Sequence, residues 1–114
     1  MPVDIQWLFD DQLPAQCARY PDRVRELGAI YQVHITGRDG GDWHLDLTAD
    51  PPTVRAGIAD ADCTLTIASA DFQRLYQNPL MNGMTLYIQG KIKAWGDPSL
   101  YARFPRLLAL PRAY

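Results

Sequence analysis

Two histidines and a nearby carboxylate are the residues whose types come closest to a metal site. His34 and His44 occupy polar positions in two segments that we expect to pair as strands, and Asp46 lies close behind. Imidazole nitrogens and carboxylate oxygens are ligands that zinc accepts. No regular ligand spacing links the three residues, however, and the predicted strand face is open to water. We therefore favour solvated histidines and predict no metal.

A second stretch with a familiar length is Asp39–Asp50, whose twelve residues match a calcium-binding EF-hand loop. Gly41 and Trp43 stand where such a loop needs oxygen ligands, and His44 stands where it needs a glycine. A hairpin turn explains the same residues better, so we discard the calcium interpretation.

The motifs of several enzyme classes are missing from the sequence. It contains no nucleophile elbow, no phosphate-binding loop, no His-Glu-x-x-His and no Cys-x-x-Cys. The only serines, Ser69 and Ser99, stand at predicted helix starts, where capping is the favoured role. No activated nucleophile or acid–base pair can be assembled, so we do not expect an independent enzyme.

The composition narrows the class of protein. The chain has 114 residues, 47% of them hydrophobic and 21% charged, and a formal net charge of −2. This predicts one ordered domain over residues 1–114 and disfavours nucleic-acid binding, which needs a basic surface. Cys17 and Cys63 are too few for a disulfide framework and indicate reduced thiols in a cytoplasmic protein. No stretch approaches the roughly 18 apolar residues of a membrane span, and the acidic N-terminus argues against a signal peptide.

Hydrophobic periodicity predicts the elements that must position any site. Residues 4–27 form an apolar helical stripe that begins at a capping Asp4 and is broken at Pro14 and Pro21. Residues 28–36 and 43–49 then alternate with a period of two, and a glycine-rich turn separates them. We therefore expect an antiparallel hairpin.

The second half of the chain mixes strands with short helices. We expect strands at 53–58, 63–68 and 91–95 and a helix at 70–77, whereas residues 80–89 suit a helix or a strand. Asp97 and Pro98 open a last helix that Pro105 should kink. Grouped strands followed by helices predict an α+β fold with a largely antiparallel sheet covered by helices on one face.

Three features of this half admit both an ordinary and a functional interpretation. The segment Phe72–Ile88 is rich in large apolar side chains, for which composition alone favours a core. Arg103, Arg106 and Arg112 could meet anionic lipid headgroups, although a solvated helix face is favoured. Trp95 alternates onto the side of the lysines, so it marks either a protein contact or a strand end that turns back into the core.

Several short motifs in order resemble the sterol carrier protein 2 family. They are Ala61-Asp62 followed by the alternating residues 63–67, then Asp71-Phe72, then Gly90–Asp97 with its Gly-Lys-Ile-Lys start. The hairpin at 28–47 is also similar. The resemblance covers most of residues 28–110. The sequence departs from the family pattern at residues 77–80 and at Trp95, both near the expected ligand region.

The resemblance implies a five-stranded, mostly antiparallel sheet with an apolar tunnel between sheet and helices for fatty acyl chains, sterols or other lipids. It implies no cofactor, no metal and no catalytic residue. We assign the lipid-lining role to nine residues, and we take the last helix, kinked at Pro105, as the candidate gate. The nine are Phe72, Leu75, Leu80, Met81, Met84, Ile88, Phe104, Leu107 and Leu108.

Two other functions stay open beside a lipid-binding and lipid-transfer module. The first is an accessory protein that holds the isoprenoid tail of a quinone intermediate, since the stretch 78–97 is also similar to family members of that kind. The second is a ligand-free interaction domain that forms a homodimer through its sheet face around Trp95. Transient contact with a membrane also stays open.

Overall fold

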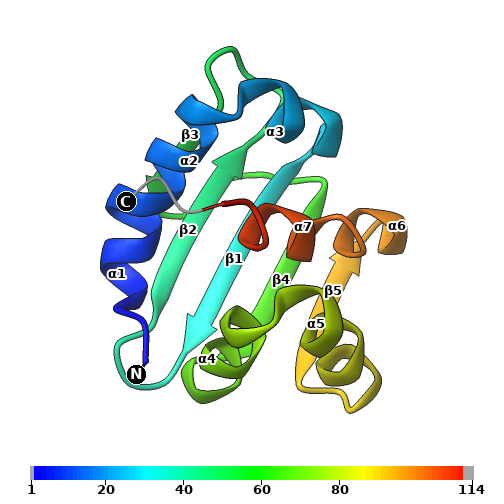
Figure 1. The fold of residues 1–114 in the computed structure, drawn as a ribbon. Coiled ribbons are helices and arrows are strands. Elements are labelled where there is room, and N and C mark those ends of the chain that lie inside the picture. The colour runs from blue at the N-terminus through cyan, green and yellow to red at the C-terminus, as the bar shows by residue number, and fades with distance from the viewer. Residues whose placement is uncertain (1, 112–114) are drawn as a thin grey trace.

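A computed structural model describes residues 2–111, and Figure 1 shows one sheet with the helices gathered against one of its faces. The strands run in the order β3-β2-β1-β4-β5. β1 pairs parallel with β4, and the other neighbouring pairs are antiparallel, which confirms the predicted α+β fold. The bounds are β1 (Ile30–Thr36), β2 (Gly41–Asp46), β3 (Thr53–Ala56), β4 (Cys63–Ala68) and β5 (Ile92–Gly96).

The N-terminal segment is helical and interrupted, as predicted. The Asp4 carboxylate accepts a hydrogen bond from the Trp7 backbone N–H at 3.1 Å and so caps the first helix. A π-helical turn precedes the helix that contains Pro14, and Pro21 is the first residue of the next helix. The elements are α1 (Ile5–Trp7), the π-helical turn η1 (Leu8–Gln12), α2 (Leu13–Arg19) and α3 (Pro21–Leu27).

The β1–β2 hairpin buries its odd-numbered side chains, as the alternation predicts. Val33 lies opposite Trp43 in the register, and both are buried. The predicted second strand is too long, because β2 ends at Asp46. The Asp46 carboxylate accepts hydrogen bonds from the backbone N–H groups of Thr48 and Ala49, and this turn takes the chain out of the ladder.

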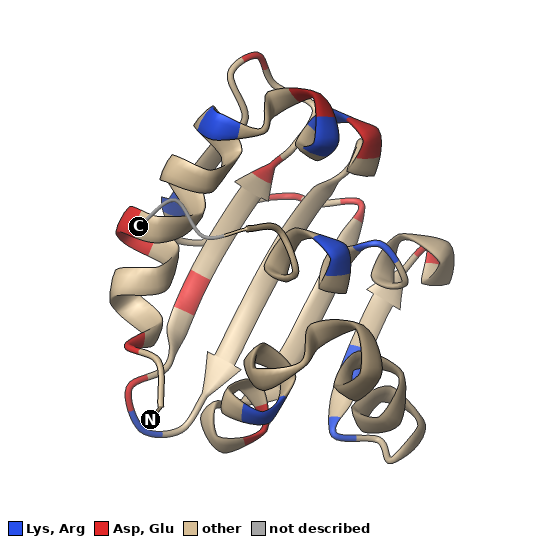
Figure 2. Cartoon of the chain, in the orientation of Figure 1, with Lys and Arg blue, Asp and Glu red and all other residues tan. Residues whose placement is uncertain are grey.

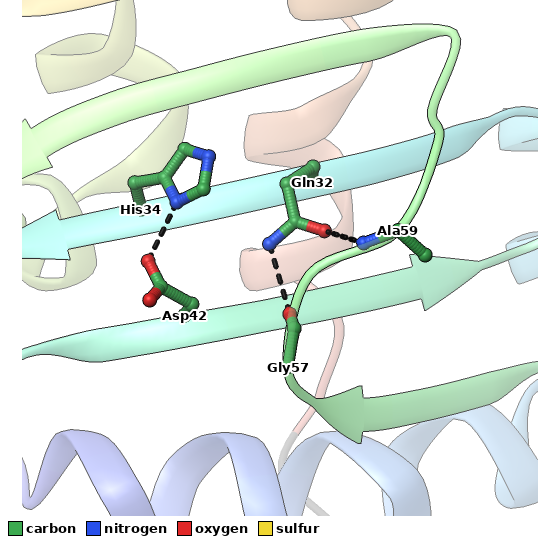
Figure 3. Close-up of polar contacts among 5 residues, drawn as sticks. All are labelled: Gln32, His34, Asp42, Gly57 and Ala59. Atoms are coloured by element: carbon green, nitrogen blue, oxygen red, sulfur yellow. Dashed lines mark hydrogen bonds and ion pairs between the residues drawn. The ribbon is translucent and has the colours of Figure 1, made fainter.

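The connection between β3 and β4 crosses the face of the sheet that the helices leave open (Figure 3). β3 ends at Ala56, two residues earlier than predicted, because Gly57 adopts a φ of +122° and starts the crossover. The buried Gln32 holds this connection with two hydrogen bonds. Its Nε2 donates to the Gly57 carbonyl oxygen, and its Oε1 accepts from the Ala59 N–H, both at 3.0 Å.

The segment with an ambiguous pattern is helix α5 (Pro79–Ile88), which follows helix α4 (Ser69–Gln77). The Asn78 side chain accepts from the Met81 N–H at 3.5 Å, and Pro79 occupies the first turn of α5. The predicted cap at Ser69 is wrong. Ala68 holds the N-cap position of α4 without a side-chain hydrogen bond, and Ser69 is already helical.

The C-terminal segment forms two short helices, α6 (Pro98–Tyr101) and α7 (Phe104–Leu108), instead of one kinked helix. Pro105 lies in the first turn of α7, where its missing N–H costs no helical bond. Asp97 caps α6, as predicted. Its carboxylate accepts from the Ser99 N–H at 2.9 Å and from the Ser99 hydroxyl at 2.7 Å, so the predicted cap at Ser99 is wrong.

The core lies between the helices and the inner face of the sheet. Phe9 stacks on Trp43 with ring centroids 4.5 Å apart, and Tyr31 meets Phe104 at 5.5 Å. These pairs join the N-terminal and C-terminal helices to β1 and β2, and buried aliphatic side chains fill the space around them. Within residues 2–111, no helix is long and apolar enough to cross a membrane.

Candidate functional site

The nine residues assigned to a lipid site fall into two groups in the structure. Five are buried beneath the helices, and four are exposed on α5. The buried group is Phe72, Leu75, Phe104, Leu107 and Leu108, and the exposed group is Leu80, Met81, Met84 and Ile88.

The buried group comes from α4 and α7, which lie over the sheet (Figure 1). Phe72 is fully buried and lies 5.7 Å from the Phe9 ring, and Phe104 packs on Tyr31. Sequence periodicity finds these residues because each is the inward position of its helix. They form an apolar layer between the C-terminal helices and β1 and β4.

Helix α5 closes this layer from outside, through residues that the sequence analysis did not assign. Leu86 and Gly83 are buried on its inner side. Gly83 packs so closely on α7 that a Cβ built there would lie 2.9 Å from the Pro105 Cγ. The Tyr101 hydroxyl, on α6, donates to the Gly83 carbonyl oxygen at 2.8 Å. The signal in the sequence for this close approach is a glycine, between Asn82 and Met84, inside a segment that otherwise suits a helix.

The buried interior contains no charged side chain among the described residues. The three buried polar side chains are Gln12, Gln16 and Gln32, and each is hydrogen-bonded within the protein. In residues 2–111 no buried side-chain nitrogen or oxygen lacks a partner. The layer therefore presents no unused polar group to a ligand, and it would select one by volume and shape.

Burial moves the pKa values of the titratable groups of the interior further above neutral pH. Desolvation raises the pKa of the Cys63 thiol to about 11 and that of the Cys17 thiol to about 11. It raises the pKa of the Tyr101 hydroxyl and of the Tyr31 hydroxyl to about 12. None of these four groups is ionised at neutral pH, so the layer stays uncharged.

A hollow of about 580 Å³ lies elsewhere, at the N-terminal end of the molecule. It is bounded by Pro2–Gln6, by Arg38 and Asp39 in the β1–β2 turn, and by residues at the start of α4 including Gln73. Gln73 holds this end together, since its Oε1 accepts from the Val3 N–H and its Nε2 donates to the Val3 carbonyl oxygen, both at 2.8 Å. None of the nine predicted residues lines this hollow.

The histidines on the open face of the sheet are not assembled into a metal site. His34 lies opposite Asp42, and His44 lies opposite Gln32, so the two imidazoles do not face each other across the hairpin. The His34 Nδ1 is 2.5 Å from Asp42 Oδ1, and the His44 Nε2 is 2.9 Å from the Asp60 carbonyl oxygen. Figure 3 shows the first of these pairs. The described part of the chain contains no cluster of three metal-binding side chains.

Two other predicted surface features can be located. Trp95 pairs with Thr64 on the open face of the sheet and is 55% exposed, so it does not turn back into the core. Arg106 is exposed on α7, and Arg103 precedes that helix. Arg112 lies outside the described residues.

Comparison with known proteins shows which family has this sequence pattern and fold. A family model described as the SCP-2 sterol transfer family matches residues 11–109. Hydroxysteroid dehydrogenase-like protein 2 of Rattus norvegicus is 32% identical over 87 residues, which are 75% of this chain and 16% of the rat protein. The chain thus spans about a sixth of that relative.

Two solved structures share the fold. The apo form of sterol carrier protein 2 from Yarrowia lipolytica has a TM-score of 0.69 and 26% identity over 91% of this chain and 83% of that one. The sterol carrier protein-2 of Aedes aegypti in complex with C16 fatty acid has a TM-score of 0.60 and 19% identity over 85% and 94%. The chain described here belongs to the SCP-2 sterol transfer family.

Proposed function

We propose that this protein is a non-catalytic carrier that binds an apolar lipid between its C-terminal helices and its sheet. The observation that carries the proposal is the family match over residues 11–109 on a chain whose helix–sheet interior is apolar and uncharged. The Aedes aegypti protein of the same fold is a palmitate complex, which supports a hydrocarbon ligand. The dehydrogenase-like relative contributes only a sixth of its length to the match and supports no activity here.

The free energy for binding would come from burying hydrocarbon. Each buried methylene contributes about 0.8 kcal/mol, so a C16 chain gains on the order of 12 kcal/mol before costs. Loss of motional freedom and imperfect fit remove several kcal/mol of this gain. Micromolar affinity therefore requires no polar anchor. Since the interior contains no charged side chain, a carboxylate or headgroup would stay at the surface.

Entry of a ligand requires a helix to move. Phe72, Leu75 and Phe104 are at most 2% exposed, so water does not reach them in this conformation. Instead of the last helix with Pro105 that the sequence suggested, helix α5, whose Gly83 packs on Pro105, is the element we expect to shift. Two tertiary hydrogen bonds hold it, one from Tyr101 to the Gly83 carbonyl and one from the Asn82 Nδ2 to the Arg74 carbonyl at 2.6 Å.

Photo-crosslinking with a palmitate analogue that carries a diazirine near its methyl end tests the site directly. We expect mass spectrometry to find the label on peptides that contain the buried group, above all Phe72, Leu75 and Phe104. An excess of unlabelled palmitate should suppress the labelling, and trypsin-digested wild type without irradiation is the blank. Labelling confined to the N-terminal hollow would contradict the proposed site.

The identity of the natural ligand needs a separate measurement. Native mass spectrometry of freshly purified protein, followed by solvent extraction, should release an acyl or sterol-like lipid. A prenyl quinone as the main extracted species would replace the proposed function with a quinone-pathway role. Protein that yields no lipid and binds no palmitate would contradict carrier function altogether.

A further inference from the structure

Helix α5 exposes an apolar face to solvent. Leu80, Met84 and Ile88 recur every four residues on this face, and Met81 lies beside them. These four side chains are 62–75% exposed, and Tyr87 at the border is 41% exposed. The helix contains no charged residue from Pro79 to Ile88. A surface helix ordinarily turns polar residues outward, so this outer face is suited to an apolar environment.

Two polar side chains on this helix already have partners within the protein. The Thr85 hydroxyl donates to the Met81 carbonyl oxygen at 3.3 Å, and the Asn82 side chain donates to the Arg74 carbonyl oxygen. A polar group that loses water costs free energy unless it is hydrogen-bonded. The outer face of α5 can therefore leave water without leaving these two side chains unbonded.

The part of the chain that contains α5 has a net positive charge. Residues 74–111 contain five basic side chains and one acidic side chain, whereas residues 2–73 contain five basic and twelve acidic ones. Figure 2 shows α5 free of charge, with a positive and a negative segment on α4 before it and positive segments at β5 after it. The two on α4 are Arg74 and Asp71, whose charged groups lie 3.9 Å apart. The backbone fixes both neighbours to α5, since the Arg74 carbonyl accepts from Asn82 and the Lys91 N–H donates to the Leu86 carbonyl oxygen at 2.9 Å. Net positive charge therefore borders the apolar face at the end of α5, next to Lys91.

We propose that the outer face of α5 is a docking surface for an anionic lipid bilayer. Its apolar side chains would enter the interfacial region while Arg74 and Lys91 meet the headgroups, as in other interfacial helices. A second copy of the chain fits less well. A symmetric dimer through α5 would bring the same basic residues together, and like charges oppose such an interface.

The proposal goes beyond the interior lipid site and gives α5 two roles on its two sides. Its inner residues Gly83 and Leu86 close the apolar layer, and its outer residues would rest in the membrane. Docking would place α5, the helix that must move for ligand entry, at the bilayer. The bilayer is also the source of an apolar lipid. Vesicle binding does not require ligand uptake, so the two ideas can fail separately.

The first test is flotation with vesicles of phosphatidylcholine containing 30% phosphatidylserine. The double variant Met84→Asp/Ile88→Asp should bind these vesicles roughly tenfold or more weakly than wild type, since two apolar contacts become charged. Ile58→Asp is the matched control, because Ile58 is 72% exposed on the β3–β4 connection, away from α5. It should bind as wild type does. Circular dichroism on all three proteins checks folding.

The second test separates charge from apolar contact. Lys91→Glu should weaken binding to the anionic vesicles about fivefold or more and leave weak binding to pure phosphatidylcholine unchanged. Arg55→Glu, at an exposed site on β3, is the control with the same charge change.

Three results would overturn the docking proposal. They are absent binding of wild type to anionic vesicles, equal binding by the double variant, and a wild-type dimer in sedimentation that the double variant abolishes. Palmitate uptake measured without vesicles keeps the two proposals apart. Uptake without vesicle binding overturns docking alone, and vesicle binding without uptake overturns the carrier function alone.

Discussion

The Tyr101 hydroxyl donates a hydrogen bond of 2.8 Å to the Gly83 carbonyl oxygen at a buried position. This bond ties α6 to the middle of α5, and the Tyr101 ring stacks on Tyr87 with centroids 4.9 Å apart. The bond therefore helps to hold α5 against the rest of the protein although the outer face of α5 is apolar. The contact is made through the backbone of α5, so it does not depend on any outward side chain.

Removal of the Tyr101 hydroxyl should loosen α5. Tyr101→Phe leaves the Gly83 carbonyl without its side-chain donor, so we expect the free energy of unfolding in urea to fall by about 1–2 kcal/mol. Exchange of a fluorescent fatty acid should become faster. Tyr87→Phe keeps the ring stack and is the matched control, with little expected change because Tyr87 is already half exposed. Equal stability of the two variants would mean that the hydroxyl does not hold α5.

The close approach of α5 to α7 makes a second prediction. Gly83→Ala would place a methyl group 2.9 Å from the Pro105 Cγ, a distance that forces the helices apart. Overpacking costs about 1–3 kcal/mol, and the better helix propensity of alanine returns about 1 kcal/mol. We expect a net loss of about 1 kcal/mol in thermal or urea unfolding.

The control for this change is Thr85→Ala, which raises helix propensity at an exposed position of the same helix. It should leave the free energy of unfolding unchanged or slightly higher. If Gly83→Ala is as stable as Thr85→Ala, the packing of Pro105 on α5 is looser than the structure indicates.

The hairpin and β4 were predictable because one side of each strand meets water. Alternation of apolar and polar residues then reports the pleat directly, as at Tyr31, Val33 and Ile35. The end of β2 at Asp46 was not predictable from this pattern, since Leu47 continues the alternation and its N–H still donates to the Ala29 carbonyl oxygen at 3.0 Å. Hydrogen bonds from the Thr48 and Ala49 N–H groups to the Asp46 carboxylate determine where the strand ends. Hydrophobic periodicity does not reveal such bonds.

Helix α5 was ambiguous for a related reason. Its inner and outer sides are both apolar, so Met84, Leu86 and Ile88 alternate as a strand would, while Met81, Met84 and Ile88 keep helical spacing. The same feature led the sequence analysis to place Leu80 and Met84 in one site with Phe72. Residue type cannot tell the inward side of a helix from an outward side that is equally apolar.

The buried side-chain amide of Gln32 holds the connection between β3 and β4. Gln32→Leu removes both hydrogen bonds to the connection and leaves the Ala59 N–H and the Gly57 carbonyl without that partner. We expect the free energy of unfolding to fall by about 2 kcal/mol. His34→Ala is the control, since it removes a neighbour on the same face that pairs with the exposed Asp42 (Figure 3).

The control should cost about 1 kcal/mol or less, because pairs near the surface contribute little. Urea unfolding of both variants gives the comparison. A His34→Ala variant that loses as much stability as Gln32→Leu would show that the amide has no special part in holding the connection.

Stability should fall in mildly alkaline solution because two thiols are buried. Cys17 and Cys63 have a folded-state pKa near 11, raised by desolvation above the ordinary value of 9.0. The unfolded chain therefore releases protons first, and stability that is complete below pH 9 is lost as the pH rises toward 11. Between pH 8 and 9.5 we expect a loss of about 1 kcal/mol per thiol in urea unfolding.

The variant Cys17→Ala isolates this effect. It should be less stable than wild type at pH 8, yet its further loss between pH 8 and 9.5 should be about half as large, because one titrating thiol is gone. Measurement below pH 9.5 keeps the ordinary tyrosine range out of the comparison. A pH dependence identical to that of wild type would show that Cys17 is not the buried group that titrates on unfolding.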